Sequence, residues 1–294
     1  MRSPAVVGAV VPRAVAVAAS ADPRGGGRAG RLSVLGVPLD AVGAAEAKEA
    51  LRTFLAEPWD GCCRHVVTLN PEYVMAARRN AEFAMGIAKG DLITADGVGV
   101  VIAARMLGGS EGAGVERVTG VDLVDWIAEM SGPVEVPVFL LGGRSRVTEE
   151  AARRLSRRFP GARIAGWWSE GTPSPAHDAE ALARIRASGA RAVVVAYGAL
   201  GQVAWIERNR QELAAAGVRV AVGVGGVLDF LAGTVPRAPT VVRRAGLEWL
   251  YRLIREPWRW RRQAVLPVFG LRVLLEKLWR RGNRAGKIAR PKSS

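Results

Sequence analysis

The chain contains little cysteine and little histidine. Only two cysteines occur among 294 residues, and they are the neighbours Cys62 and Cys63, so no disulfide framework can join distant segments. The two histidines, His65 and His177, do not form a recognisable zinc-binding pattern with them. These absences argue against a disulfide-stabilised secreted domain and against a zinc centre, and they favour an intracellular protein.

Three further signals are missing. No uncharged apolar run reaches the roughly 18 residues of a membrane-spanning helix. Neither a P-loop nor a convincing G-x-G-x-x-G turn with a downstream ribose-binding carboxylate occurs, which argues against an ordinary dinucleotide oxidoreductase. The N-terminus loosely resembles a secretion signal, but Pro12 and Arg13 interrupt its apolar run. We therefore expect residues 1–31 to be a disordered leader.

What the chain does have is an excess of basic residues in a globular composition. Hydrophobic residues make up 49% and charged residues 23%, which is typical of a folded protein. Lys and Arg number 42 against 27 Asp and Glu, a formal net charge of +15. Such an excess favours a polyanionic partner: nucleic acid, an anionic membrane surface or phosphorylated substrates.

Strand–turn–helix patterns repeat along residues 32–239. Apolar runs followed by turn residues and then by helical spacing occur at 64–80, 91–109, 136–161, 190–213 and 218–233. Such units in series predict an α/β fold, with a parallel sheet flanked by helices on both faces. Ligands of such sheets bind at the carboxyl ends of the strands. The residues predicted at that edge are Thr68, Asn70, Asp96, Gly142, Gly143, Gly198 and the glycines between 223 and 226.

These residues also have plain structural interpretations. Asp96 can cap the helix that begins after it, and Asn70 can cap a helix with Pro71 at its first position. The glycines can simply close turns, although glycine also lets backbone amides at helix N-termini approach phosphate groups closely. The pattern alone leaves both interpretations open.

Residues 240–294 are predicted to form a basic amphipathic helical appendage. Between 243 and 262, seven arginines stand against two glutamates, a net charge of +5. Apolar residues recur at helical spacing, at Leu247, Leu250, Tyr251, Ile254 and Trp258 and again at Leu271, Leu274, Leu275 and Leu278. This pattern favours a membrane interface. The alternatives are a helix packed on the domain and, because Arg and Trp alternate, binding of single-stranded nucleic acid, although no nucleic-acid-binding fold signature accompanies it.

A run of motifs resembles the WecG/TagA/CpsF glycosyltransferases. The segments are "TLNPEYVMAARRN", "DLITADGVGVVIAARMLGG", "ERVTGVDL", "FLLGGRSRVTEEAARRL", "GVGGVLDFLAG" and "RAPTVVRRAGLEWLYRLIREPWR", in this order from about residue 34 to about residue 262. The resemblance implies a Rossmann-like α/β fold with a C-terminal membrane-docking appendage. It also implies inverting transfer of a sugar (N-acetylmannosamine or a related hexose or uronic acid) from a UDP-sugar to a polyprenyl-diphosphate-linked sugar, in the synthesis of cell-surface polysaccharide or teichoic acid.

The resemblance also assigns residues. An inverting transfer needs a base that takes the proton of the acceptor hydroxyl as its oxygen attacks the anomeric carbon. Asp96 matches the aspartate of the family's D-G-[VI]-G motif, for which this role has been proposed, and Thr68 and Asn70 match its T-x-N-x-E motif. The predicted catalytic residues are Asp96, Thr68 and Gln202. The predicted substrate-binding residues are Asn70, Gly97, Gly142, Gly143, Gly198, Gly225, Gly226, Asp229, Arg237, Arg252, Arg259 and Arg262.

Two details qualify the match. No D-x-D motif occurs, so we expect no metal or other cofactor, and we expect amides and arginines to meet the leaving-group charge. The family pattern G-x-P-[KR]-Q-E-x-W-I reads "GALGQVAWI" here, with Leu200, Gly201 and Val203 in place of proline, a basic residue and glutamate. The lost charges leave the identity of the donor sugar open.

Two hypotheses follow. The first is a glycosyltransferase, cytoplasmic and peripheral on the inner face of the cell membrane, with Asp96 as base. Its expected partners are a UDP-sugar, the lipid-linked acceptor, an anionic membrane surface and a second copy of the chain, but no nucleic acid. The second is a basic nucleotide- or nucleic-acid-binding regulatory protein in which Asp96 only caps a helix.

Overall fold

The computed structural model describes residues 30–288 except 57, 240, 243–245 and 258–259, and only the backbone of Arg252, Arg262 and residues 284–288. Within this part of the chain, six parallel strands form one sheet in the order β4-β3-β8-β7-β5-β6. The strands are β3 (Arg64–Leu69), β4 (Leu92–Ala95), β5 (Val138–Gly142), β6 (Ile164–Trp168), β7 (Ala192–Ala196) and β8 (Val220–Gly223). The predicted α/β class is confirmed.

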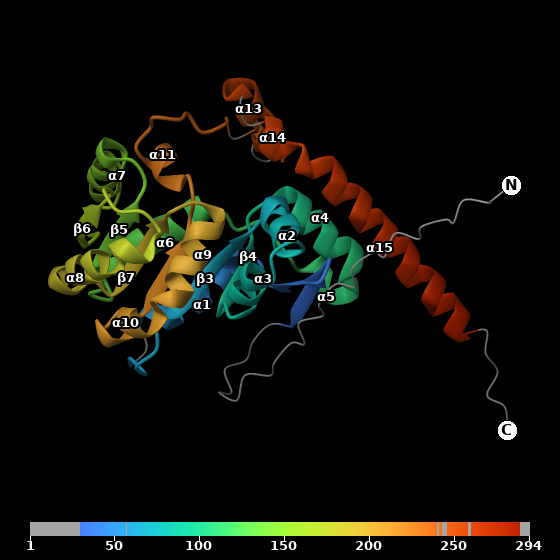
Figure 1. The fold of residues 1–294 in the computed structure, drawn as a ribbon, viewed down its shortest axis with the longest axis horizontal. Helices are drawn as coiled ribbons and strands as arrows, with labels where there is room; N and C mark the ends of the chain where they lie inside the picture. The colour runs from blue at the N-terminus through green and yellow to red at the C-terminus, as the bar shows by residue number, and fades with distance from the viewer. Residues whose placement is uncertain (1–29, 57, 240, 243–245, 258–259, 289–294) are drawn as a thin grey trace, which may run out of the picture.

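One face of the sheet is covered by helices that share a buried apolar cluster with it, and Figure 1 labels them around the strands. The strands are almost continuously apolar because parallel strands are buried on both faces, and on this face residues such as Val66, Leu140 and Val222 belong to one buried cluster. The helices packed over them are α1 (Ala44–Ala56), α6 (Gly120–Ser131), α7 (Ser145–Arg158) and α11 (Val227–Leu231).

The opposite face is covered in two halves. Over β5, β7 and β8 lie α8 (Asp178–Ser188), which a short 3-10 helix (Pro175–His177) precedes, α9 (Ala199–Arg208) and α10 (Arg210–Ala215). Over β3 and β4 lie α2 (Pro71–Ala77), α3 (Ala81–Ala88) and α4 (Val98–Leu107), which α5 (Gly109–Ala113) follows, together with the antiparallel hairpin β1 (Arg31–Val34) and β2 (Val37–Asp40).

This arrangement opens a crevice at the carboxyl ends of the strands. β3 and β8 are neighbours in the sheet, but β3 leads into α2 on one face and β8 leads into α11 on the other. Where neighbouring strands send their helices to opposite faces, the loops separate and a ligand can enter.

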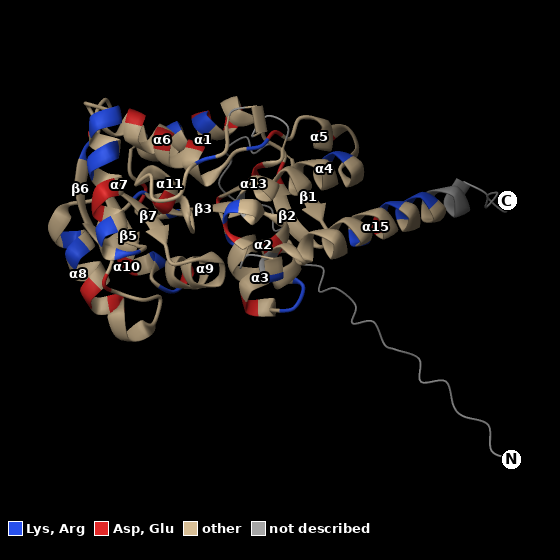
Figure 2. Ribbon diagram, turned by 90° about the horizontal axis from the view of Figure 1, so that it is seen from above, with Lys and Arg blue, Asp and Glu red and all other residues tan. Residues whose placement is uncertain are grey.

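The helices after the α/β body include α13 (Glu248–Arg255), α14 (Trp260–Gln263) and α15 (Val265–Ile288). α15 begins beside α2 and α4 and then extends away from the body, with Lys and Arg recurring along it (Figures 1 and 2). Phe269 and Val273 are buried against the body, at 4% and 3% exposure. None of the helices in the described part of the chain combines the length and apolar composition needed to cross a membrane.

The apolar residues of α15 therefore divide into two sets. Phe269 and Val273, which the predicted stripe did not include, pack on the domain. The four leucines of the predicted stripe remain 52–63% exposed: Leu271, Leu274, Leu275 and Leu278.

Candidate active site

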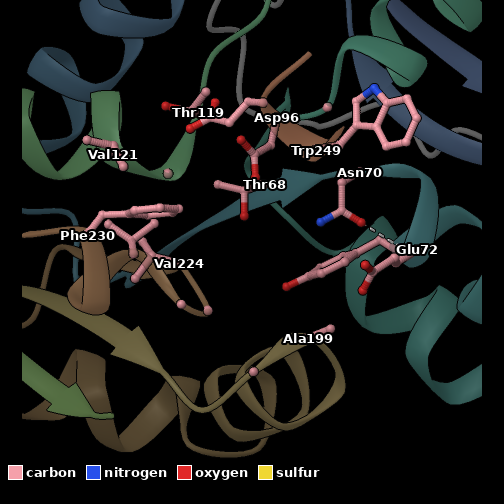
Figure 3. Close-up of a pocket in the computed structure, with 18 of the residues that line it drawn as sticks. Thr68, Asn70, Glu72, Asp96, Thr119, Val121, Ala199, Val224, Phe230 and Trp249 are labelled. Atoms are coloured by element: carbon pink, nitrogen blue, oxygen red, sulfur yellow. Dashed lines mark hydrogen bonds between the residues drawn. The ribbon is translucent and has the colours of Figure 1, made fainter. Parts of the chain in front are cut away.

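A pocket of about 490 Å³ lies at the carboxyl ends of β3, β4, β7 and β8. It collects residues from distant parts of the sequence, as Figure 3 shows. Its lining includes Thr68, Asn70, Asp96, Gly97, Arg117, Thr119, Gly143, Arg144, Gly198, Gln202, Gly225, Gly226, Asp229, Arg237, Glu248 and Trp249. Most of the residues predicted at this edge are therefore brought together.

Asp96 follows β4 and is half-buried in the pocket wall. Its backbone N–H donates to the carbonyl oxygen of Leu69 at 2.9 Å, which holds it beside the end of β3. The interpretation that Asp96 caps the following helix is wrong, because Gly97 is the N-cap residue of α4 and no side chain caps that helix. The Asp96 side chain points toward Thr68 and into the pocket (Figure 3).

The electrostatic surroundings keep the Asp96 carboxylate basic. Its pKa is raised from an ordinary value of 3.8 to about 6, chiefly by burial and to a smaller extent by the nearby carboxylates of Glu248 and Asp122. The guanidinium of Arg117 and a hydrogen bond from the backbone N–H of Gly120 act in the opposite direction. A carboxylate of this kind is ionised near neutral pH yet accepts a proton more readily than an exposed one.

Two arginines and a glutamate form a partly buried group beside Asp96. Arg117 donates through Nε to the Asp96 carbonyl oxygen at 3.0 Å and pairs through Nη2 with Glu248. Arg237 lies 3.7 Å from the Glu248 carboxylate and 3.9 Å from that of Asp122. The Nε of Arg237 is buried and has no hydrogen-bond partner among the described residues.

Thr68 and Asn70 lie at the end of β3. The Thr68 hydroxyl donates to the Gly223 carbonyl oxygen of β8 at 2.9 Å, and the side chain is buried. Asn70 is the N-cap of α2, because its Oδ1 accepts from the Tyr73 backbone N–H at 3.0 Å. The capping interpretation is therefore confirmed, while the amide nitrogen of Asn70 still points into the pocket (Figure 3).

Gln202 is almost completely buried on α9 and connects two walls of the pocket. Its Nε2 donates to the Tyr73 hydroxyl at 2.5 Å, and its Oε1 accepts from the Gly225 backbone N–H at 2.7 Å. These bonds position the loop after β8 against α2. The predicted catalytic role of Gln202 stays a prediction.

The three residues that depart from the family motif do not line the pocket. Leu200 is exposed on α9, and Val203 is buried at 2% exposure in the cluster that includes α3. Gly201 lies against Pro173, since a Cβ at this position would stand 2.8 Å from the proline ring. A longer side chain at position 201 would collide there, and Val203 packs in the core, so two of the three changes lie where α9 packs on its neighbours.

The predicted glycines differ in what they do. Gly143, Gly198 and Gly225 have positive φ angles of 78°, 76° and 57°, a region that favours glycine, and all three line the pocket with Gly97 and Gly226. Gly142 also has a positive φ but lies behind the pocket, where a Cβ would stand 2.7 Å from the Tyr197 ring.

Charged groups also reach the pocket from α7 and α11. Asp229 of α11 accepts from Arg144 Nη2 at 2.6 Å, and this hydrogen bond raises the pKa of the Arg144 guanidinium. Arg144 precedes α7 and is an exposed cation at the rim of the pocket. Of the predicted appendage arginines, Arg259 lies outside the described residues and Arg252 and Arg262 are described by backbone only, so their binding role stays a prediction.

Sequence reasoning missed Arg117, Arg144, Glu248 and Trp249 as site residues. Arg117 had one visible signal, because it lies in the family-like segment "ERVTGVDL", two residues before Thr119, which forms a capping box with Asp122 at the start of α6. Glu248 and Trp249 reach the pocket from α13 through the fold. Among the described residues, no group of three or more His, Cys, Asp or Glu side chains is arranged to hold a metal ion.

Comparison with known proteins gives a consistent result. Residues 32–283 match the glycosyl transferase WecG/TagA/CpsF family. An N-acetylglucosaminyldiphosphoundecaprenol N-acetyl-beta-D-mannosaminyltransferase of Bacillus spizizenii (strain W23) is 35% identical over 209 residues, 71% of this chain and 78% of the relative. A protein of the same name from Bacillus subtilis (strain 168) is 30% identical over 212 residues, 72% of this chain and 79% of the relative. The predicted enzyme class, a hexosyltransferase, is confirmed, and the chain belongs to the WecG/TagA/CpsF family of glycosyl transferases.

Proposed function

We propose that the chain transfers a sugar, with inversion, from a UDP-sugar to a polyprenyl-diphosphate-linked N-acetylglucosamine, with Asp96 as the general base. The observation that carries this proposal is Asp96, a half-buried carboxylate with a pKa of about 6 in the pocket at the strand ends. The acceptor class follows from the names of the two Bacillus relatives. N-acetylmannosamine, named in the same relatives, is the first donor sugar to test.

The proposed chemistry needs one proton transfer. The Asp96 carboxylate takes the proton of the acceptor hydroxyl while that oxygen forms a bond to the anomeric carbon of the donor. The bond from this carbon to the UDP oxygen breaks at the same time on the opposite face, so the configuration inverts. A base with a pKa near the working pH is efficient in such a step because it is both ionised and strongly proton-accepting.

The diphosphate that leaves carries negative charge, and we propose that this chain meets it without a metal ion. Arg237 offers a buried Nε with no hydrogen-bond partner among the described residues, and Arg144 stands at the rim. The N-terminus of α9 begins after Gly198 at the pocket wall, and its backbone N–H groups favour anions. Preorganised donors of this kind stabilise charge that develops at the leaving group.

The membrane surface is the proposed location of the acceptor. α13 leaves Leu250 and Ile254 exposed, α15 presents four exposed leucines beside Trp279, and basic residues recur along α15. An apolar stripe bordered by arginines and lysines suits the interface of an anionic bilayer. We propose that these helices hold the enzyme on the inner face of the cell membrane, where the lipid-linked acceptor is anchored.

The first experiment measures UDP release with a panel of UDP-sugars and a short-chain polyprenyl-diphosphate-linked N-acetylglucosamine. Wild type is compared with Asp96→Asn and with the control Asp125→Asn, which removes a carboxylate of α6 whose pKa burial also raises but which lies outside the pocket. We expect acceptor-dependent release to fall at least about 100-fold in Asp96→Asn, the lower range for general-base catalysis, and to persist in the control. Equal release by Asp96→Asn would remove Asp96 from the chemistry.

The membrane proposal has its own test. Sedimentation with phosphatidylglycerol-containing vesicles and with phosphatidylcholine vesicles compares wild type with the triple variant Leu271→Ser, Leu274→Ser and Leu278→Ser of α15. Leu200→Ser is the control, since Leu200 is also an exposed leucine but lies on α9. We expect only the triple variant to lose binding to anionic vesicles. Equal binding by all three proteins, or preferential salt-sensitive binding to oligonucleotides, would contradict this use of α15.

A further inference from the structure

Arg117 joins the proposed base to the first helix after the α/β body. Its backbone forms a parallel bridge with Ala95, the last residue of β4, so it is fixed beside the strand that leads into Asp96. Its Nε donates to the Asp96 carbonyl oxygen at 3.0 Å, and its Nη2 donates to the carboxylate of Glu248, the first residue of α13. One guanidinium therefore connects the base with α13.

Glu248 anchors α13 on the pocket. Its side chain is only 14% exposed and lies between Arg117 and Arg237, each 25% exposed. Trp249, the next residue, lines the pocket. Removing one partner of a partly buried ion pair leaves the other charge uncompensated, which is costly. The ion pairs of Glu248 with the two arginines therefore hold the start of α13 against the body.

The groups that face the Asp96 carboxylate come from several elements. Arg117 brings positive charge from the segment before α6, whereas Asp122 of α6 and Glu248 of α13 bring negative charge, and the Gly120 backbone N–H donates a hydrogen bond. If Glu248 were removed, its negative charge would no longer offset the positive charge of Arg117 beside Asp96. That loss favours the ionised carboxylate and makes it a weaker base.

We infer that Glu248 is a positioning residue for sugar transfer, which pairs with Arg117 to seat α13 on the strand end carrying Asp96 and to balance the arginine's charge beside the base. The inference rests on the proposed role of Asp96. It makes the competence of the base depend on the seating of α13, a helix that also exposes Leu250 and Ile254.

A direct test measures the proton affinity of Asp96 itself. The aspartate side-chain carboxyl carbons of the full chain are followed by ¹³C NMR across pH, and the Asp96 signal is the one missing in Asp96→Asn. We expect Glu248→Gln to lower the Asp96 pKa by about one unit, in the range that a neighbouring charge produces, and Glu248→Asp to restore part of it. An unchanged or higher pKa in Glu248→Gln would overturn the inference.

Two further variants make this test decisive. Glu276→Gln removes the carboxylate of another partly buried ion pair with an arginine, on α15, and is expected to leave Asp96 unchanged. Arg117→Gln removes the charge that lowers the Asp96 pKa and is expected to move it upward. Because the two substitutions at the ion pair act in opposite directions, either one tests the inference if the other does not fold.

Kinetics separate this inference from the proposed function. In Glu248→Gln we expect the acid limb of the kcat/KM profile to lie about one pH unit lower than in wild type, whereas a purely structural residue would lower kcat/KM equally at every pH. An inactive Asp96→Asn with an unmoved limb in Glu248→Gln would refute the inference about Glu248 alone. A fully active Asp96→Asn would refute the base, while the NMR titration would still report on Glu248.

Discussion

The substitution Asp96→Asn is expected to stabilise the protein at neutral pH while removing activity. Folding raises the pKa of Asp96 from about 3.8 to about 6, so the folded state binds more protons than the unfolded state between these values. Stability therefore falls as pH rises through this window and levels off above it. Asn carries no titrating group, so the variant lacks this loss.

The size of the effect follows from the pKa shift. A change of about two units corresponds to about 3 kcal/mol, and because the pocket admits some solvent we expect about 2 kcal/mol. The free energy of unfolding is measured in urea from pH 4 to pH 8, and the advantage of Asp96→Asn over wild type is expected to grow by this amount. The control Glu149→Gln removes an exposed carboxylate of α7 and is expected to stay within about 0.5 kcal/mol of wild type at every pH.

A difference between Asp96→Asn and wild type that stays constant across pH would refute the reasoning. It would mean that folding does not weaken the acidity of Asp96, and the carboxylate would then lack the property that suits it to act as a base. A growing difference together with lost transfer would connect the cost in stability with the catalytic role.

Three further predictions follow from packing and hydrogen bonding. Gly142→Ala is expected to destabilise the protein more than Gly198→Ala in urea unfolding. Both positions have positive φ, but only at Gly142 would the new Cβ meet a tyrosine ring, at 2.7 Å. Equal losses of unfolding free energy in the two variants would contradict this account. Thr68→Val is expected to cost about 1–3 kcal/mol of unfolding free energy, because a buried carbonyl oxygen of β8 loses its donor, and an unchanged midpoint would count against that bond. Phe269→Ala is expected to cost about 3–5 kcal/mol of unfolding free energy, because Phe269 is only 4% exposed. Leu274→Ala is expected to cost less than about 0.5 kcal/mol, because Leu274 is 52% exposed. Similar losses of unfolding free energy in both variants would show that α15 does not pack on the body through Phe269.

The position of Asp96 was predictable from local pattern. A short apolar run followed by Asp96 and Gly97 marks the end of a buried strand, and the same holds for Thr68 and Asn70. Because the carboxyl ends of parallel strands meet at one edge, these residues had to lie near one another once the sheet formed. The structure places them around one pocket.

The partners of these residues were not predictable in the same way. Gln202 is hydrogen-bonded to Tyr73 and Gly225, which come from two other elements, and local sequence does not encode such distant pairing. In the family motif, Val203 replaces a glutamate and removes a charge, whereas in the fold Val203 is a buried core residue. The effect of each substitution depends on which face of α9 it occupies, and packing decided that face.

The sequence by itself determined the α/β class, the edge of the sheet that carries the candidate site and the basic amphipathic character of the C-terminal segment, because each depends on periodicity within one element. Only the tertiary structure decided that Phe269 packs on the body while the leucines of α15 remain exposed. It also decided that Glu248 reaches Arg117, 131 positions away in the chain, beside Asp96. Such contacts depend on how the loops leave the sheet, and that direction is a property of the assembled fold.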